Sequence, residues 1–155
     1  MILYKVVGAF VAIFAFAIML ETPKKYITYA GIVGAIGWLV YLLAIEKNPN
    51  EILATFLSAL AIAFVSQIFA RIFKIPVTVF LVAGILPTVP GAGMYRIVYY
   101  FIQNDMDMAA HYLALTLELA GAIAIGIFII DAMFRMFQKG IKQNSLRYPE
   151  KKIDK

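Results

Sequence analysis

The sequence predicts an all-α integral membrane protein with five transmembrane helices, the fourth of which is broken by a Pro/Gly segment. Hydrophobic residues make up 63% of the 155 residues, only 15% are charged, and the mean hydropathy is +0.87. A soluble domain is nearer half apolar, so no soluble core could hide this excess. The charged residues fall mostly between five apolar segments, which is typical of a polytopic membrane protein.

Each apolar segment is long enough for a helix to cross a bilayer, which takes about 20 residues. The first ends at Glu21-Thr22-Pro23-Lys24-Lys25 and is predicted to be an uncleaved span, because the apolar Ile18-Met19-Leu20 follows the only signal-peptide-like site. Asn50 is predicted to cap the third. The segments cover residues 3–20, residues 26–45, Glu51 to a point between Arg71 and Lys74, residues 75–102, and about residues 108–137.

Loop charges predict the orientation. With five crossings, the basic residues at the ends of the first and third spans and in the C-terminal tail all fall on one side. Cytoplasmic loops attract Lys and Arg, so the N-terminus is predicted outside and the C-terminus in the cytoplasm of a cell-membrane protein. Residues 1–138 would form the transmembrane domain and residues 139–155 a basic cytoplasmic tail. The net charge of +5 then reports topology, and no nucleic-acid partner is expected.

The most informative segment is Pro87-Thr88-Val89-Pro90-Gly91-Ala92-Gly93, inside the fourth span. Proline removes a backbone donor and glycine frees the dihedral angles, so this helix should break. Irregular backbone is tolerated within a membrane only where protein covers it or a wet cavity solvates it. Pro87, Pro90, Gly91, Gly93 and the following Tyr95 are therefore candidate substrate-binding residues.

Two ionisable residues are predicted inside the spans near this break. Counting at about 1.5 Å per residue puts Arg96 about 13 Å inside the outer boundary, and Glu118 at similar depth on the fifth span. Such residues need a partner or water. Either Arg96 and the amides of residues 91–95 receive an anionic substrate while Glu118 takes a proton or an ammonium group, or the two form a structural ion pair.

Other polar and small residues have a structural interpretation beside a functional one. Hydroxyl side chains in the third and fifth spans often bond back to their own helix, and an i,i+4 ion pair is expected between Asp131 and Arg135. Gln67 is harder to explain in this way. Small residues favour packing within the chain over docking of another subunit. The hydroxyl residues are Ser58, Ser66 and Thr116, and the small residues are Gly31, Gly34, Gly37, Ala122 and Gly126.

Enzyme chemistry finds little support. The chain has no cysteine, one histidine, and no HExxH motif or nucleophile elbow. Gly91-Ala92-Gly93 begins like a dinucleotide-binding fingerprint but lacks its third glycine and a preceding strand. We therefore expect no catalytic residues, metal or cofactor.

The order of features resembles the small, membrane-only subunit of the threonine/serine exporter (ThrE) family. The resemblance covers about two-thirds of the chain, to Tyr95, and Leu86-Pro87-Thr88-Val89-Pro90-Gly91 is its most specific element. It implies export of an amino acid or dicarboxylate, and a larger exporter subunit as partner, with or without self-association. The other elements that carry the resemblance are Thr22-Pro23, the Tyr29–Gly37 glycine-spaced stretch and Ala54-Thr55-Phe56-Leu57-Ser58.

The leading hypothesis is therefore a subunit of a secondary exporter of small amino acids or carboxylates, with a broken-helix substrate site. The alternative is a non-transporting membrane scaffold that stabilises a partner protein. The scaffold would tolerate changes at the break and would depend instead on Gly31, Gly34 and Gly37.

Overall fold

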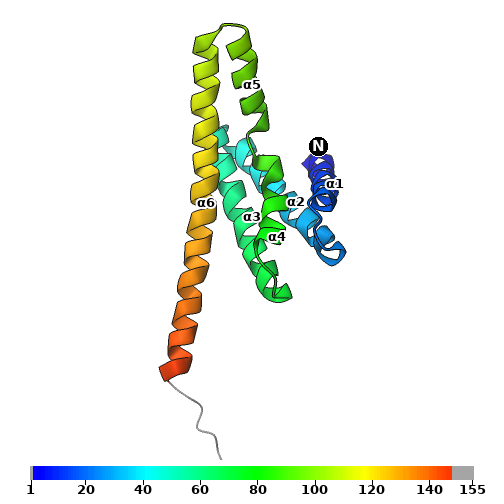
Figure 1. The fold of residues 1–155 in the computed structure, drawn as a ribbon, viewed down its shortest axis with the longest axis vertical. Coiled ribbons are helices and arrows are strands. Elements are labelled where there is room, and N and C mark those ends of the chain that lie inside the picture. The colour runs from blue at the N-terminus through cyan, green and yellow to red at the C-terminus, as the bar shows by residue number, and fades with distance from the viewer. Residues whose placement is uncertain (1, 148–155) are drawn as a thin grey trace, which may run out of the picture.

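The computed structural model describes residues 2–147, and the side chains of residues 2–137. This part of the chain is helical and contains no strand (Figure 1), as the sequence predicts. The elements are α1 (Ile2–Met19), α2 (Lys24–Lys47), α3 (Glu51–Phe73), α4 (Thr78–Ile85), the single 3₁₀ turn η1 (Leu86–Thr88), α5 (Gly91–Ile102) and α6 (Met106–Arg147).

The five predicted spans are confirmed. Within the described residues, α1, α2, α3 and the Met106–Phe137 part of α6 are each long and apolar enough to cross a membrane. The fifth candidate span consists of Thr78–Thr88 and Gly91–Ile102, which meet at a 50° bend. The predicted break in the fourth span is thus present, between Thr88 and Gly91.

Local side chains explain where several helices begin and end. The Oδ1 atom of Asn50 accepts a hydrogen bond of 3.1 Å from the Leu53 amide, which confirms the predicted cap of α3. Asp105 caps α6 in the same way, through the Met108 amide at 3.1 Å. Lys74 takes a left-handed conformation (φ 55°) and ends α3.

Helix α6 continues past the predicted end of the fifth span to Arg147, so the predicted domain boundary at residue 138 does not coincide with a helix end. Within the predicted tail, residues 139–147 are helical, and residues 148–155 lie outside the described part of the chain.

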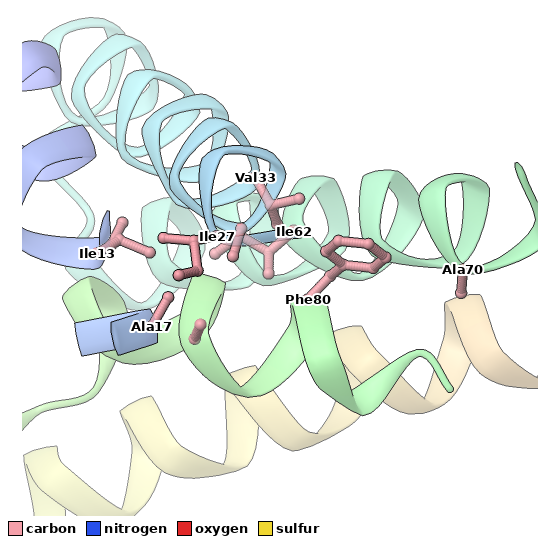
Figure 2. Packing of buried hydrophobic residues seen from close by; sticks show 9 residues of the cluster. Ile13, Ala17, Ile27, Val33, Ile62, Ala70 and Phe80 are labelled. Atoms are coloured by element: carbon pink, nitrogen blue, oxygen red, sulfur yellow. The ribbon is translucent and has the colours of Figure 1, made fainter. Parts of the chain in front are cut away.

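Helices α1 to α4 share one hydrophobic core (Figure 2). Ile13 of α1, Val33 of α2, Ile62 of α3 and Phe80 of α4 are almost fully buried in it. Aromatic rings extend the core at the end where α3 turns into α4. The ring centres of Tyr29 and Phe73 lie 4.6 Å apart. Phe80 lies edge-on to the rings of Tyr26 and Phe69, at distances that favour aromatic pairs.

Small residues allow these helices to approach closely. Gly31, Gly34 and Gly37 of α2 are buried against α1 and α3 side chains, so the predicted packing role is confirmed. Gly126 of α6 lies against α3, where a Cβ atom would sit 3.1 Å from the Ala59 Cβ and 3.3 Å from the Phe56 carbonyl oxygen.

Helix α6 is the longest element and packs along α3 and α5. Figure 1 shows that α5 and the start of α6 form a hairpin that extends beyond the turn between α2 and α3. No residue of α5 is buried, although most of its side chains are apolar. The hairpin therefore has an apolar surface that the other described helices do not cover.

The Gly126 contact yields a stability prediction. Gly126→Leu should lower the free energy of unfolding by about 1–3 kcal/mol, because backbone atoms and a methyl group of α3 cannot rotate away from the new side chain. Gly121→Leu, five residues earlier on α6, is the control, since nothing lies within 4 Å of a Cβ there. Unfolding in detergent measures both variants, and equal stability would contradict the close α3–α6 contact.

Candidate functional site

The helix break leaves backbone donors without acceptors. Val89 is extended (φ −64°, ψ 130°) and Pro90 has no amide hydrogen, so the helical ladder cannot pass through them. The Gly91 amide donates to the Val89 carbonyl at 2.8 Å and the Met94 amide donates to the Pro90 carbonyl at 3.2 Å. Within the described residues, the Ala92 and Gly93 amides make no hydrogen bond. They form a free helix N-terminus, which attracts anions.

These amides lie at a cavity of about 260 Å³ that is lined by the break and by four helices. The break contributes the backbone from Pro87 to Gly93, and α5 contributes Arg96. The remaining lining residues are Trp38 and Tyr41 of α2, Glu51 and Thr55 of α3, and Tyr112, Leu115, Thr116 and Leu119 of α6. The α6 residues follow i, i+3, i+4, i+7 spacing, so one face of that helix forms the wall.

Thr116 is the clearest unsatisfied group at this cavity. Its side chain is buried, and its hydroxyl oxygen has no hydrogen-bond partner in the described residues. The Thr116 hydroxyl packs directly against Gly93, and a Cβ atom at position 93 would overlap its Oγ1 atom. Leaving a buried hydroxyl unpaired costs about 1–3 kcal/mol, so a hydrogen-bonding ligand here would be stabilising.

The cavity also holds one cation and one carboxylate. The Arg96 guanidinium lies 5.1 Å from the centre of the Tyr112 ring, a cation–π contact. Within residues 2–137, its N–H groups make no ion pair or side-chain hydrogen bond. Glu51, the first residue of α3, lines the same cavity. The site can therefore offer donors to an anionic group and an acceptor to a cationic one.

The structure brings together five of the seven predicted site residues. Pro87, Pro90, Gly91, Gly93 and Arg96 line the cavity. The other two do not: Tyr95 is 70% exposed on another face of α5, and Glu118 is exposed on α6.

The Arg96–Glu118 ion pair, one of the two alternatives from the sequence, is not formed among the described side chains. Glu118 follows Thr116 by two residues, so it points about a third of a turn or more away from the α6 face that lines the cavity. Arg96 packs on Tyr112 of that lining face instead.

The position of Arg96 relative to the other helices follows from the α5–α6 hairpin, which extends beyond the α2–α3 turn (Figure 1). Arg96 shares its cavity with Glu51, the residue at which α3 begins. The cavity therefore extends from the start of α3 to Trp38, well inside α2.

Sequence reasoning missed the residues that complete the site from α2 and α3. Trp38 and Tyr41 stack with ring centres 5.0 Å apart, and Tyr41 resembles an interface anchor in the sequence. Glu51 resembles an ordinary loop charge beside the Asn50 cap. Only the position of the α2–α3 turn next to the break could have indicated their role.

A second polar cluster, away from this cavity, ties α3 to α6. The Gln67 amide donates to Asp131 Oδ1 at 3.0 Å, and Arg135 Nε lies 2.7 Å from Asp131 Oδ2, which confirms the predicted pair. Arg71 donates to the Gln67 side-chain oxygen at 2.7 Å. Ser58 donates to the Gly37 carbonyl at 2.8 Å, across to α2 and not back to its own helix.

The fold and the cavity define a class of protein: a multi-pass membrane protein with a discontinuous helix whose free N-terminus lines a polar cavity. Discontinuous helices of this kind form the substrate sites of many secondary transporters. A comparison with protein families identifies the class more closely. Residues 5–133 match the family described as "Threonine/Serine exporter, ThrE", and the chain belongs to this family of transporters.

Matches to individual proteins agree with this family assignment. The chain is 26% identical over 144 residues to a threonine/serine exporter of Corynebacterium glutamicum, covering 92% of this chain and 29% of that protein. It is 25% identical over 137 residues to a probable threonine/serine exporter of Mycobacterium tuberculosis, covering 85% and 26%. An uncharacterized Haemophilus influenzae protein is 26% identical over 102 residues, covering 66% and 34%. The chain thus spans about a third or less of the length of these relatives. No solved structure matches.

Single-cysteine labelling tests whether water fills the cavity. The chain has no native cysteine, so an introduced cysteine is the only thiol that a reagent can label. Ala92→Cys should react with a water-soluble maleimide at least tenfold faster than Val82→Cys. Both positions are exposed in the isolated chain, but Val82 lies on the apolar α4 surface, where lipid suppresses the thiolate. Equal rates in membrane vesicles would contradict a hydrated site at the break.

Proposed function

We propose that this chain is one membrane module of a secondary exporter of small amino acids or carboxylates, of threonine/serine or succinate type, driven by the proton-motive force. The substrate carboxylate binds at the N-terminus of α5. The observation that carries this proposal is the convergence of the free Ala92 and Gly93 amides, the Arg96 guanidinium and the unpaired Thr116 hydroxyl on one cavity.

The combined binding energy of these groups decides whether the site can hold a carboxylate. A helix N-terminus contributes up to about 2 kcal/mol when partly buried, which alone does not compensate for the desolvation of a carboxylate. A hydrogen bond to a charged group adds about 1.5–3 kcal/mol. Two amides, one guanidinium and one hydroxyl together are sufficient to hold a small anion.

Glu51 gives the site a place for an ammonium group. It lies on the same cavity as Arg96, so a zwitterion can meet a charge of opposite sign at each end. The stacked Trp38 and Tyr41 rings offer additional cation–π contact. We assign to Glu51 the proton- or ammonium-binding role that the sequence had suggested for Glu118.

The volume of the cavity favours a small solute. Sites for drug-sized ligands are typically about 300–1,000 Å³, and this cavity has about 260 Å³. A threonine, a serine or a short dicarboxylate is the class of ligand that suits it.

The partner follows from what the chain leaves uncovered. Alternating access needs a second repeat that moves against the first. The apolar side chains of α5 are exposed, and the relatives are about three times longer. We propose that a larger exporter subunit, or a second copy of this chain, covers α5 and closes the cavity. The glycines of α2 on which a scaffold role would depend are already buried within this chain.

Blocking the cavity tests transport. Gly91→Leu should abolish efflux of labelled threonine while the protein still inserts, because a Cβ on Gly91 meets nothing within 4 Å and the larger side chain can occupy the cavity. Gly121→Leu, equally open but away from the cavity, should export normally. Efflux is measured in cells that express the chain together with a larger exporter subunit. Undiminished export by Gly91→Leu would remove the proposed path.

Charge substitutions test the two ends of the site. Arg96→Gln should raise the KM about 10- to 100-fold for both threonine and its analogue without the amino group, 3-hydroxybutyrate, since both keep the carboxylate. Arg96→Lys should raise the KM less than Arg96→Gln does. Glu51→Gln should raise the KM for threonine and leave that for 3-hydroxybutyrate within about twofold. If Glu51→Gln affects both substrates equally, Glu51 does not bind the ammonium group.

A further inference from the structure

A crevice between α4 and α6 lies at the opposite end of α3 from the cavity at the helix break. Among the described residues, α4 and α6 do not pack against each other, although both pack against α3. Two adjoining cavities of about 420 Å³ and 380 Å³ occupy this space and share Gln67, Val77, Asp131 and Arg135 as lining residues. We treat the two adjoining cavities as one groove between α4 and α6, with residues of α3 lining both parts.

The two parts of the groove differ in chemistry. The part at the turn between α3 and α4 is lined by Arg71, Lys74 and Arg135, with Asp131 as the single carboxylate. The part that runs further along the helices is lined mainly by apolar side chains, among them Leu81, Ile127 and Phe128. A cationic end joined to an apolar channel matches a molecule with an anionic head and a hydrocarbon chain.

The cations retain free donor capacity. Arg71 uses one nitrogen, Nη1, to reach the Gln67 carbonyl and side-chain oxygens at 2.8 and 2.7 Å, and its guanidinium lies 4.1 Å from the Phe134 ring centre. Its other N–H groups have no protein acceptor in residues 2–137, and Lys74 makes no ion pair there. Asp131 is already bonded to Gln67 and Arg135. Three cations against one carboxylate leave an excess of two positive charges.

We propose that this groove binds an anionic phospholipid, with the lipid phosphate at Arg71, Lys74 and Arg135 and one acyl chain between α4 and α6. Basic pockets between transmembrane helices on the cytoplasmic side bind anionic head groups. Loop charges predict that this end of the molecule is cytoplasmic. The bound lipid would fill the space that α4 and α6 leave open beside the Gln67–Asp131 contact.

Native mass spectrometry of the full chain in detergent tests the proposal, with phosphatidylglycerol and phosphatidylcholine of identical acyl chains as probes. The chain should retain phosphatidylglycerol at least fivefold over phosphatidylcholine. The double variant Lys74→Asn/Arg135→Gln should bind phosphatidylglycerol about 30-fold more weakly. Asparagine tolerates the left-handed conformation of Lys74, so α3 keeps its end. The control Lys24→Gln/Lys25→Gln removes the same charge at the start of α2 and should change binding less than twofold.

A second variant tests the apolar part with every charge intact. Ala124→Trp fills the channel and should reduce phosphatidylglycerol binding at least tenfold, whereas Ala114→Trp, exposed elsewhere on α6, should not. Equal retention of both lipids, equal loss in the Lys24/Lys25 control, or full binding by Ala124→Trp would each overturn the proposal. Displacement of the lipid by millimolar inorganic phosphate or by threonine would also overturn it, because the site would then bind a free anion or the substrate.

Discussion

The structure depends on one constraint: every backbone amide in an apolar environment needs an acceptor. Val89 and Pro90 interrupt the hydrogen-bond ladder of the fourth span and leave the Ala92 and Gly93 amides without partners. In hydrocarbon each free amide would cost several kcal/mol, so the break is tolerable only beside a polar cavity. The cavity and the break are thus two aspects of one feature, and Arg96 and Thr116 extend its donor set.

The contact between α3 and α6 supports this site and separates it from the lipid groove. Gly126 brings α6 against Ala59 near the middle of α3, and the Gln67–Asp131 hydrogen bond repeats the contact two turns of α3 further along. The cavity at the helix break lies mainly on one side of the Gly126 contact and the groove between α4 and α6 mainly on the other. Because α6 is a continuous helix across both, any movement of α6 against α3 changes the two sites together.

Hydropathy predicted the fold well because a bilayer restricts spanning segments to helices of nearly fixed length. The missing amide donor of proline and the free dihedral angles of glycine predicted the break at Pro90. Local spacing predicted the Asn50 cap and the Asp131–Arg135 pair. The residues that line the site were harder to predict from the sequence. Arg96 and Glu118 have suitable depths by sequence counting, but their side chains point to different faces, and only the packing of α5 on α6 determines this. Glu51 reaches the cavity because the hairpin extends beyond the α2–α3 turn, a tertiary offset that no local pattern encodes.

The exposed chemistry of α5 also supports the proposal that the chain is one module of an exporter. The membrane helix α5 buries none of its residues, and Arg96 on it makes no ion pair among the described residues. Lipid can cover Val98 or Phe101, but it does not solvate a guanidinium or two free amides. We therefore propose that a second polar surface meets α5 at the level of the cavity. The two relatives named as exporters or probable exporters are about three times as long as this chain, which leaves sufficient additional chain for such a surface. The substrate would then lie between two modules, and their relative movement could expose it to either side of the membrane.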